Sequence, residues 1–130
     1  MTAVVTGADA ARRSAASRDL GRRGEDVACR FLQEQGLVVL SRNWRCREGE
    51  LDVVATDGRR LVVCEVKTRS GLSHDDPVEA VTPEKLARVR RLALRWLAAH
   101  RVGWCEIRCD VISLLWPQDG PVRLHHLRNV

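Results

Sequence analysis

The sequence predicts a small α/β domain in which helices flank a central mixed β-sheet of four to five strands, in the order α-β-β-β-α-β-(β). Apolar residues recur at helical spacing near the N-terminus and again after Pro83, which indicates two helices. Between them, apolar runs on both sides of Asp57-Gly58 are typical of a β-hairpin. The chain of 130 residues is long enough for one domain with its own hydrophobic core.

The N-terminal residues 1–18 are rich in Ala, Ser and Arg, so we expect a disordered leader there. They lack the long apolar core of a secretory signal, which favours a cytoplasmic location. Residues 19–130 are expected to form a single domain that begins with a helix over 19–35. Gly21 and Gly24 would let this helix approach the sheet closely. Its apolar positions at helical spacing are Leu20, Val27, Ala28, Phe31 and Leu32.

The later elements also follow from local patterns. Residues 37–44 are expected to form a strand that runs into a basic loop. Thr82 supplies a helix-capping oxygen, Pro83 suits the first helical position, and Glu84 adds an acid to the first turn. The helix that begins there is expected to reach about His100. The other expected segments are strands over 50–55, 60–67, 105–115 and 122–127 and a polar loop over 70–81.

Charge and cysteine content narrow the range of partners. The net charge of +5 suits a polyanionic partner such as nucleic acid without requiring one. No apolar run approaches the ~18 residues of a membrane helix, so no membrane association is expected. A zinc site through Cys105 and Cys109 with His125 or His126 is a weak alternative, because their spacing matches no common zinc pattern.

The predicted hairpin carries four charged residues whose arrangement depends on the strand register. A two-residue turn at Asp57-Gly58 pairs Asp52 with Val63 and Glu50 with Glu65. Side chains two residues apart share a face, so one side of the hairpin presents Glu50, Asp52, Glu65 and Lys67. The opposite side is apolar and is expected to be the core side; it presents Leu51, Val53, Ala55, Val62, Cys64 and Val66.

In this register Asp52 and Glu65 are diagonal neighbours about 7–8 Å apart, from where two carboxylates can reach one hard cation. Lys67 would offset part of their mutual repulsion. The spacing by itself leaves a second interpretation open, in which these residues form a solvated cluster of surface ion pairs.

Short motifs along the chain resemble a known protein family. Asp52 and Glu65-Val66-Lys67 are similar to the D…(D/E)XK signature of the restriction-endonuclease-like, or PD-(D/E)XK, nuclease superfamily. Five blocks over roughly residues 18–130 resemble the YraN family of bacterial proteins, which this resemblance relates to Holliday-junction resolvases. The blocks are Gly24-Glu25, Arg42-Asn43-Trp44-Arg45, Gly49-Glu50-Leu51-Asp52, Glu65-Val66-Lys67-Thr68-Arg69 and Arg108-Cys109-Asp110-Val111.

The resemblance implies a three-layer, restriction-endonuclease-like domain and metal-dependent catalysis. It implies that Asp52 and Glu65 bind Mg²⁺, with Mn²⁺ able to substitute, and that the carbonyl of Val66 joins them. It also implies that Lys67 acts beside the attacking water and that Glu25 on the first helix contributes to catalysis. From the residues alone, a boundary glutamate in a solvated pair with an arginine is the better explanation of Glu25. Because the related resolvases work as pairs, a homodimer is an expected state.

Basic residues near the acids are candidates for contact with nucleic acid. We expect arginines to bind phosphates and a tryptophan to stack on a base, in the set Arg42, Trp44, Arg45, Arg47 and Arg69. A core or edge position for Trp44 remains open. Three further arginines align along one side of the second helix and could line a phosphate-binding groove, although a solvated face is the ordinary interpretation: Arg88, Arg91 and Arg95. Asp110 is expected in a structural ion pair with Arg108.

Three functions fit these residues. The favoured one is a Mg²⁺-dependent endonuclease that hydrolyses DNA phosphodiester bonds, with branched or structured DNA as a candidate substrate. The second is a non-catalytic nucleic-acid-binding protein with a nuclease-like fold, and the third is an interaction protein without a nucleic-acid role. The presence of Asp52, Glu65 and Lys67 together favours the first.

Overall fold

The computed structural model describes residues 7–71 and 81–130, so the polar loop predicted over 70–81 lies mostly outside the described residues. Two helices and five strands follow the predicted order, including the short last strand. They are α1 (Gly7–Glu34), β1 (Val38–Cys46), β2 (Gly49–Thr56), β3 (Leu61–Arg69), α2 (Pro83–Ala99), β4 (Ile107–Leu115) and β5 (Arg123–Leu127). Neither helix in these ranges carries an apolar stretch long enough to cross a bilayer.

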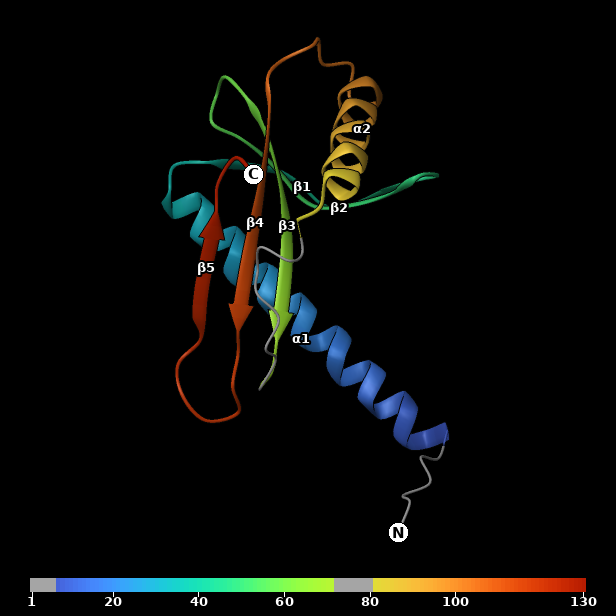
Figure 1. Ribbon diagram of the computed structural model, residues 1–130, viewed down its shortest axis with the longest axis vertical. Coiled ribbons are helices and arrows are strands. Elements are labelled where there is room, and N and C mark those ends of the chain that lie inside the picture. The colour runs from blue at the N-terminus through green and yellow to red at the C-terminus, as the bar shows by residue number, and fades with distance from the viewer. Residues whose placement is uncertain (1–6, 72–80) are drawn as a thin grey trace.

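The strands form one mixed sheet in the order β1-β2-β3-β4-β5 (Figure 1). The β1–β2, β2–β3 and β4–β5 pairs are antiparallel, and β3–β4 is parallel. A parallel pair needs a long crossover, which here contains α2. α2 begins as predicted, because the side chain of Thr82 accepts a hydrogen bond from the Lys85 N–H and Pro83 opens the helix.

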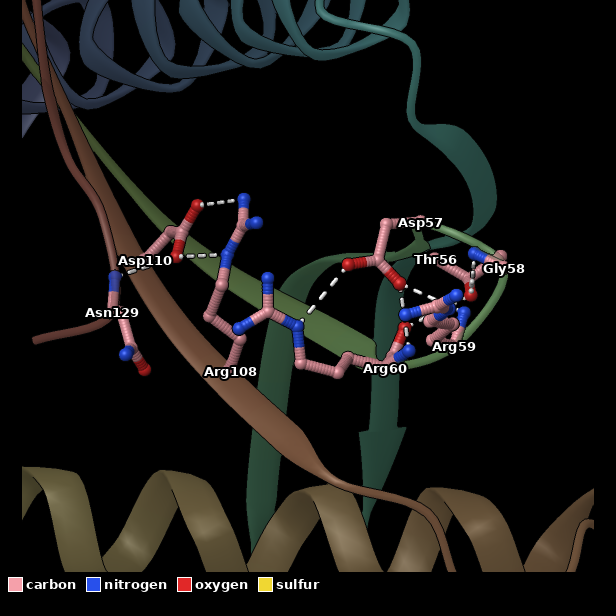
Figure 2. Close-up of polar contacts among 8 residues, drawn as sticks. All are labelled: Thr56, Asp57, Gly58, Arg59, Arg60, Arg108, Asp110 and Asn129. Atoms are coloured by element: carbon pink, nitrogen blue, oxygen red, sulfur yellow. Dashed lines mark hydrogen bonds and ion pairs between the residues drawn. The ribbon is translucent and has the colours of Figure 1, made fainter.

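Both faces of the sheet are buried, which corrects the expectation of a single core side. On β3, Val62 and Cys64 pack with residues of α1, whereas Leu61 and Val63 pack with residues of α2. Figure 2 shows strands lying between α1 on one side and α2 on the other. Continuous burial on both faces explains why the start of β3 is an unbroken apolar run. Leu51, beyond the last pair of β2 with β3, also belongs to the α2 cluster and not to the α1 side.

The first helix begins at Gly7, twelve residues before the predicted start at Asp19. Residues 7–18, which were expected to be a disordered leader, are therefore helical. The physical reason is their Ala and Arg content, because these residues have high intrinsic helix propensity. This part of α1 projects beyond the sheet in Figure 1.

The β2–β3 register also differs from the expected one. The loop has four residues, so Thr56 pairs with Leu61 and Val54 pairs with Val63. Asp57 stabilises this loop, since its Oδ1 accepts the N–H groups of Arg59 at 2.8 Å and Arg60 at 2.7 Å (Figure 2). These two hydrogen bonds, Arg60 first, lower the pKa of Asp57 to about 2. The register moves by two residues, and this even shift keeps Asp52, Glu65 and Lys67 on one face, although Leu51 lies on the α2 side instead of its predicted face.

Candidate functional site

The candidate site lies where β2 and β3 stop pairing. The last pair in their ladder is Val53 with Cys64, and the next residues along the two strands are Asp52 and Glu65. Asp52 contacts the neighbouring strand through its side chain, because its Oδ2 accepts the Val66 N–H at 2.9 Å. The carboxylate thus occupies the end of the ladder and ties β2 to the Glu65-Val66-Lys67 segment.

The four charged residues that share one face of the hairpin line a single cavity of about 360 Å³. Val66 also lines it, and α2 supplies the opposite wall with Lys85, Arg88, Val89 and Leu92. The sequence analysis missed Lys85 and Arg88 at this site. The sequence predicts that both lie on the second helix, but it does not predict which strand the basic face of that helix lies beside. The hairpin residues in the cavity are Glu50, Asp52, Glu65 and Lys67.

The electrostatics of the two central acids favour a bound proton or cation. Burial raises the pKa of Asp52, and Glu50 adds repulsion, while the Val66 N–H and Lys67 partly oppose them. Burial also raises the pKa of Glu65, and repulsion from Asp52 raises it further. The nearby cations of the cavity lower this pKa in part. A carboxylate pair with both pKa values raised is typical of functional sites, where the chain tolerates unfavourable charge.

Glu25 lies on α1 and is held by β1. Asn43 donates from Nδ2 to Glu25 Oε2 at 2.9 Å. Asn43 itself has φ of 52°, a left-handed conformation that Asn tolerates better than most residues. Burial raises the pKa of Glu25 and repulsion from Asp52 contributes, with Asn43 and Arg42 opposing. Glu25 therefore experiences the charge of Asp52, although it is not among the residues that line the cavity.

A close contact between α1 and β3 sets the position of Glu25. A Cβ atom at Gly24 would collide with the side chain of Thr68, so only glycine permits this approach. A Cβ at Gly21 would meet nothing within 4 Å. The predicted close approach is confirmed for Gly24 and is wrong for Gly21.

The donor set suits a hard cation with a partly hydrated shell. Within residues 7–71 and 81–130, no three His, Cys, Asp or Glu side chains converge as a ligand group. The cavity is lined by the carboxylate residues Glu50, Asp52 and Glu65 and also by Val66. Mg²⁺ in proteins is commonly held by one or two carboxylates while it keeps several waters, so this set fits it.

The five residues predicted to contact nucleic acid are spread over the β1–β2 hairpin and the end of β3. The basic loop was expected to follow a strand over 37–44, but β1 runs to Cys46, so Arg45 lies in the strand and only Arg47 lies in the turn. Arg42 forms an ion pair with Asp26 on α1 at 2.6 Å, and Arg45 forms one with Glu50 at 2.8 Å. Trp44 packs against the α2 cluster, and Arg69 ends β3. Their contact with nucleic acid remains a prediction.

Asp110 forms the predicted ion pair with Arg108 in the interior. Arg108 is 4% and Asp110 1% exposed, and the guanidinium donates to both carboxylate oxygens at 2.9 and 2.8 Å (Figure 2). The carboxylate also contacts His126 Nε2 at 2.7 Å and accepts the Asn129 N–H at 3.0 Å. Burial raises the pKa of Asp110, but these hydrogen bonds outweigh it and hold the pKa below its usual value.

The zinc alternative is wrong for the described residues. Cys105 and Cys109 belong to the α2 cluster, whereas His126 contacts Asp110 and the edge of the Phe31 ring on the α1 side. His125 pairs with Ser113, four residues along β4 from Cys109, which corresponds to about 13 Å of strand. The thiols and imidazoles therefore cannot share one metal ion.

Comparison with known proteins shows which chains this one resembles. Residues 24–114 match the model of a family described as "Uncharacterised protein family UPF0102". A UPF0102 protein from Frankia casuarinae is 56% identical over 110 residues, covering 85% of this chain and 93% of the relative. Others from Kineococcus radiotolerans and Acidothermus cellulolyticus are 54% and 48% identical, covering 85% and 83% of this chain and 92% and 90% of the relatives.

Proposed function

The chain belongs to the UPF0102 family, which confirms its resemblance to YraN, and from this premise we propose that it is a Mg²⁺-dependent endonuclease acting on DNA. The proposal includes membership of the restriction-endonuclease-like superfamily. A mixed five-stranded sheet with α1 on one face and α2 on the other supports it. Branched or structured DNA, a homodimer and a cytoplasmic location are parts of the same proposal.

One observation carries the proposal. Asp52 accepts the N–H of Val66, and Asp52, Glu65 and Lys67 line the same cavity. Two partly buried acids beside a lysine, on adjoining strands, form a combination that suits metal-assisted phosphodiester hydrolysis. A solvated cluster of ion pairs would not explain why burial raises the pKa of both acids.

The roles of the residues follow from their positions. Asp52, Glu65 and the Val66 carbonyl would hold Mg²⁺, or Mn²⁺ in its place. Bound Mg²⁺ supplies Lewis acidity, which lowers the pKa of water and stabilises negative charge on phosphate. Lys67 neutralises charge that develops on the phosphate during the reaction. Glu25, held in place by Asn43, adds negative charge near Asp52.

A second candidate is a nucleic-acid-binding protein that does not cleave. The observation that favours it is the basic character of α2, where Lys85 and Arg88 reach the acidic cavity. In that case Lys85 and Arg88 would bind phosphate, and the acids of the cavity would reduce the affinity by repelling it. This candidate shares the DNA partner with the first and differs from it only in the reaction.

A cleavage panel tests the proposal. Linear duplex, single-stranded, flapped and four-way DNA are incubated with the full chain and Mg²⁺, Mn²⁺ or EDTA. We expect metal-dependent cleavage of at least one substrate and its loss in Asp52→Asn, which removes charge but keeps the shape. If the wild-type protein binds DNA but cleaves none of these substrates, the non-catalytic candidate replaces the proposal.

A further inference from the structure

A second cavity of about 460 Å³ lies beside the acidic one. It is lined by Glu48 from the β1–β2 turn and by Arg88, Arg91, Leu92 and Arg95 from α2. Arg88 and Leu92 line both cavities. The two cavities therefore adjoin at these side chains, and we call the two together the α2 groove, which leads from the acids along α2.

The walls of the α2 groove are fixed by the hairpin and by helical spacing. Arg88, Arg91 and Arg95 are three and four residues apart, so they lie along one side of α2. The β1–β2 turn forms the other wall, where Glu48 Oε2 pairs with Arg95 Nε at 3.1 Å. Gly49 suits this turn, because its φ of 151° is one that other residues rarely adopt.

The charge of the α2 groove complements a polyanion. α2 carries five basic residues and one acid, and the three arginines of the groove span about 10 Å at 1.5 Å per residue. Arg91 and Arg95 are exposed. A guanidinium suits phosphate better than an ammonium does, because its planar fork can donate two hydrogen bonds to one phosphate.

We propose that the α2 groove binds the phosphate backbone of the nucleic-acid strand whose phosphodiester bond lies at the Asp52–Glu65 site. This inference rests on the proposed function and adds the path of the strand. Arg88 contacts the strand where the two cavities meet, and Arg91 and Arg95 contact the phosphates that follow. Glu48 competes with phosphate for Arg95 and so weakens binding.

Equilibrium binding of fluorescent single-stranded and duplex DNA tests the strand path without cleavage, in EDTA over a series of salt concentrations. The variants are the double change Arg91→Ala/Arg95→Ala, the gain variant Glu48→Gln and the control Arg90→Ala. Arg90 has the same charge on the same helix, but its Nη1 donates to the Ile107 carbonyl at 3.4 Å, away from the groove.

The double variant is expected to bind about tenfold more weakly at low salt, and to lower the slope of log K against log[salt] by about 0.7–0.9 per lost contact. Arg90→Ala should stay within about twofold of wild type, and Glu48→Gln should bind more tightly because Arg95 is released. Unfolding curves that match wild type show that the altered side chains act on binding and not on folding.

Three results overturn the strand path. One is a double variant that binds like Arg90→Ala, the second is a wild-type protein that binds no DNA, and the third is poly-glutamate binding with the same dependence on Arg91 and Arg95. The third would make the groove a surface for acidic protein. The cleavage panel tests the nuclease independently of the groove. If the double variant loses DNA binding but the wild-type protein cleaves no DNA, the groove is supported and the nuclease is rejected. If the wild-type protein cleaves DNA but the double variant binds DNA normally, the nuclease is supported and the groove is rejected.

Discussion

Asp52 accepts the backbone N–H of Val66 at 2.9 Å, one position beyond the last residue pair between β2 and β3. One carboxylate oxygen therefore accepts the hydrogen bond that a strand carbonyl would otherwise accept. Because the donor is the residue after Glu65, this bond holds Asp52 beside Glu65. This contact links the stability of the sheet end to the chemistry of the proposed site.

Changing Asp52 separates these two roles. Because burial raises its pKa, the ionised carboxylate destabilises the metal-free protein at neutral pH, so Asp52→Asn should raise the free energy of unfolding. Asp52→Ala leaves the Val66 N–H without an acceptor, so it should be less stable than Asp52→Asn by about 1–3 kcal/mol. Urea unfolding in EDTA measures both, and equal stability of the two variants would contradict a role for the hydrogen bond.

The raised pKa values of Asp52 and Glu65 also predict a pH dependence. The folded state binds these protons more tightly than the unfolded state, so their contribution to stability falls as pH rises from the unfolded pKa values through the folded ones. In metal-free buffer this decline should be smaller in the double variant Asp52→Asn/Glu65→Gln. Unfolding curves between pH 4 and pH 8 measure it, and parallel profiles for wild type and variant would oppose the assignment.

A divalent ion bound by Asp52 and Glu65 should offset the loss of folding stability that their ionisation causes at neutral pH. Binding to the folded state alone stabilises a protein by about 2.7 kcal/mol when the ligand is at 100 times its Kd. Mn²⁺ should therefore raise the thermal midpoint of wild type but not of Glu65→Gln. Glu48→Gln removes an acid outside the acidic cavity and is the matched control, which should respond like wild type. A shift that persists in Glu65→Gln would place the ion elsewhere.

Lys67 should matter for cleavage more than for binding. Removing a group that stabilises charge in the transition state typically costs about 10²–10³ in rate, so Lys67→Ala should lose cleavage by that factor. Its DNA affinity should change by only a few-fold, since Lys85 and Arg88 remain in the cavity. Single-turnover rates and binding in EDTA separate the two effects, and wild-type cleavage by Lys67→Ala would remove it from the reaction.

Gly24 and Gly21 offer a matched pair on α1. Gly24→Ala should destabilise the protein by about 1–3 kcal/mol, because the added methyl group collides with Thr68. Gly21→Ala meets open space and should stabilise the helix by about 0.8–1 kcal/mol. Urea unfolding measures both signs. Partial recovery in Gly24→Ala/Thr68→Ala would show that Thr68 is the residue responsible.

The Arg108–Asp110 pair should be essential to folding in a way that surface pairs are not. Asp110→Ala leaves a buried guanidinium unpaired and should cost about 3–5 kcal/mol. Asp26→Ala breaks the exposed pair with Arg42 and should cost about 0–1 kcal/mol. Because its pKa is lowered, Asp110 contributes fully above its unfolded pKa, and this contribution is lost as pH falls through the folded value. Similar losses in both variants would contradict this account.

Local sequence patterns were sufficient for the helices, the strands and their order. They were also sufficient to place Asp52, Glu65 and Lys67 on one face, because side-chain alternation along a strand survives an even shift of register. They were not sufficient for the register itself, which depends on how Asp57 caps the four-residue loop. The start of α1 at Gly7 was also missed, because the Ala- and Arg-rich residues before Asp19 have a high helix propensity that the prediction of a disordered leader did not weigh.

What the sequence determined by itself was a hairpin with two acids and a lysine on one face, together with its family. The tertiary structure decided that α2 covers this face, that Lys85 and Arg88 enter the cavity, and that Asn43 holds Glu25. The physical reason is the range of the forces involved. Periodicity records which side chains share a face within one element, whereas contacts between distant elements depend on how α1 and α2 pack against opposite sides of one sheet.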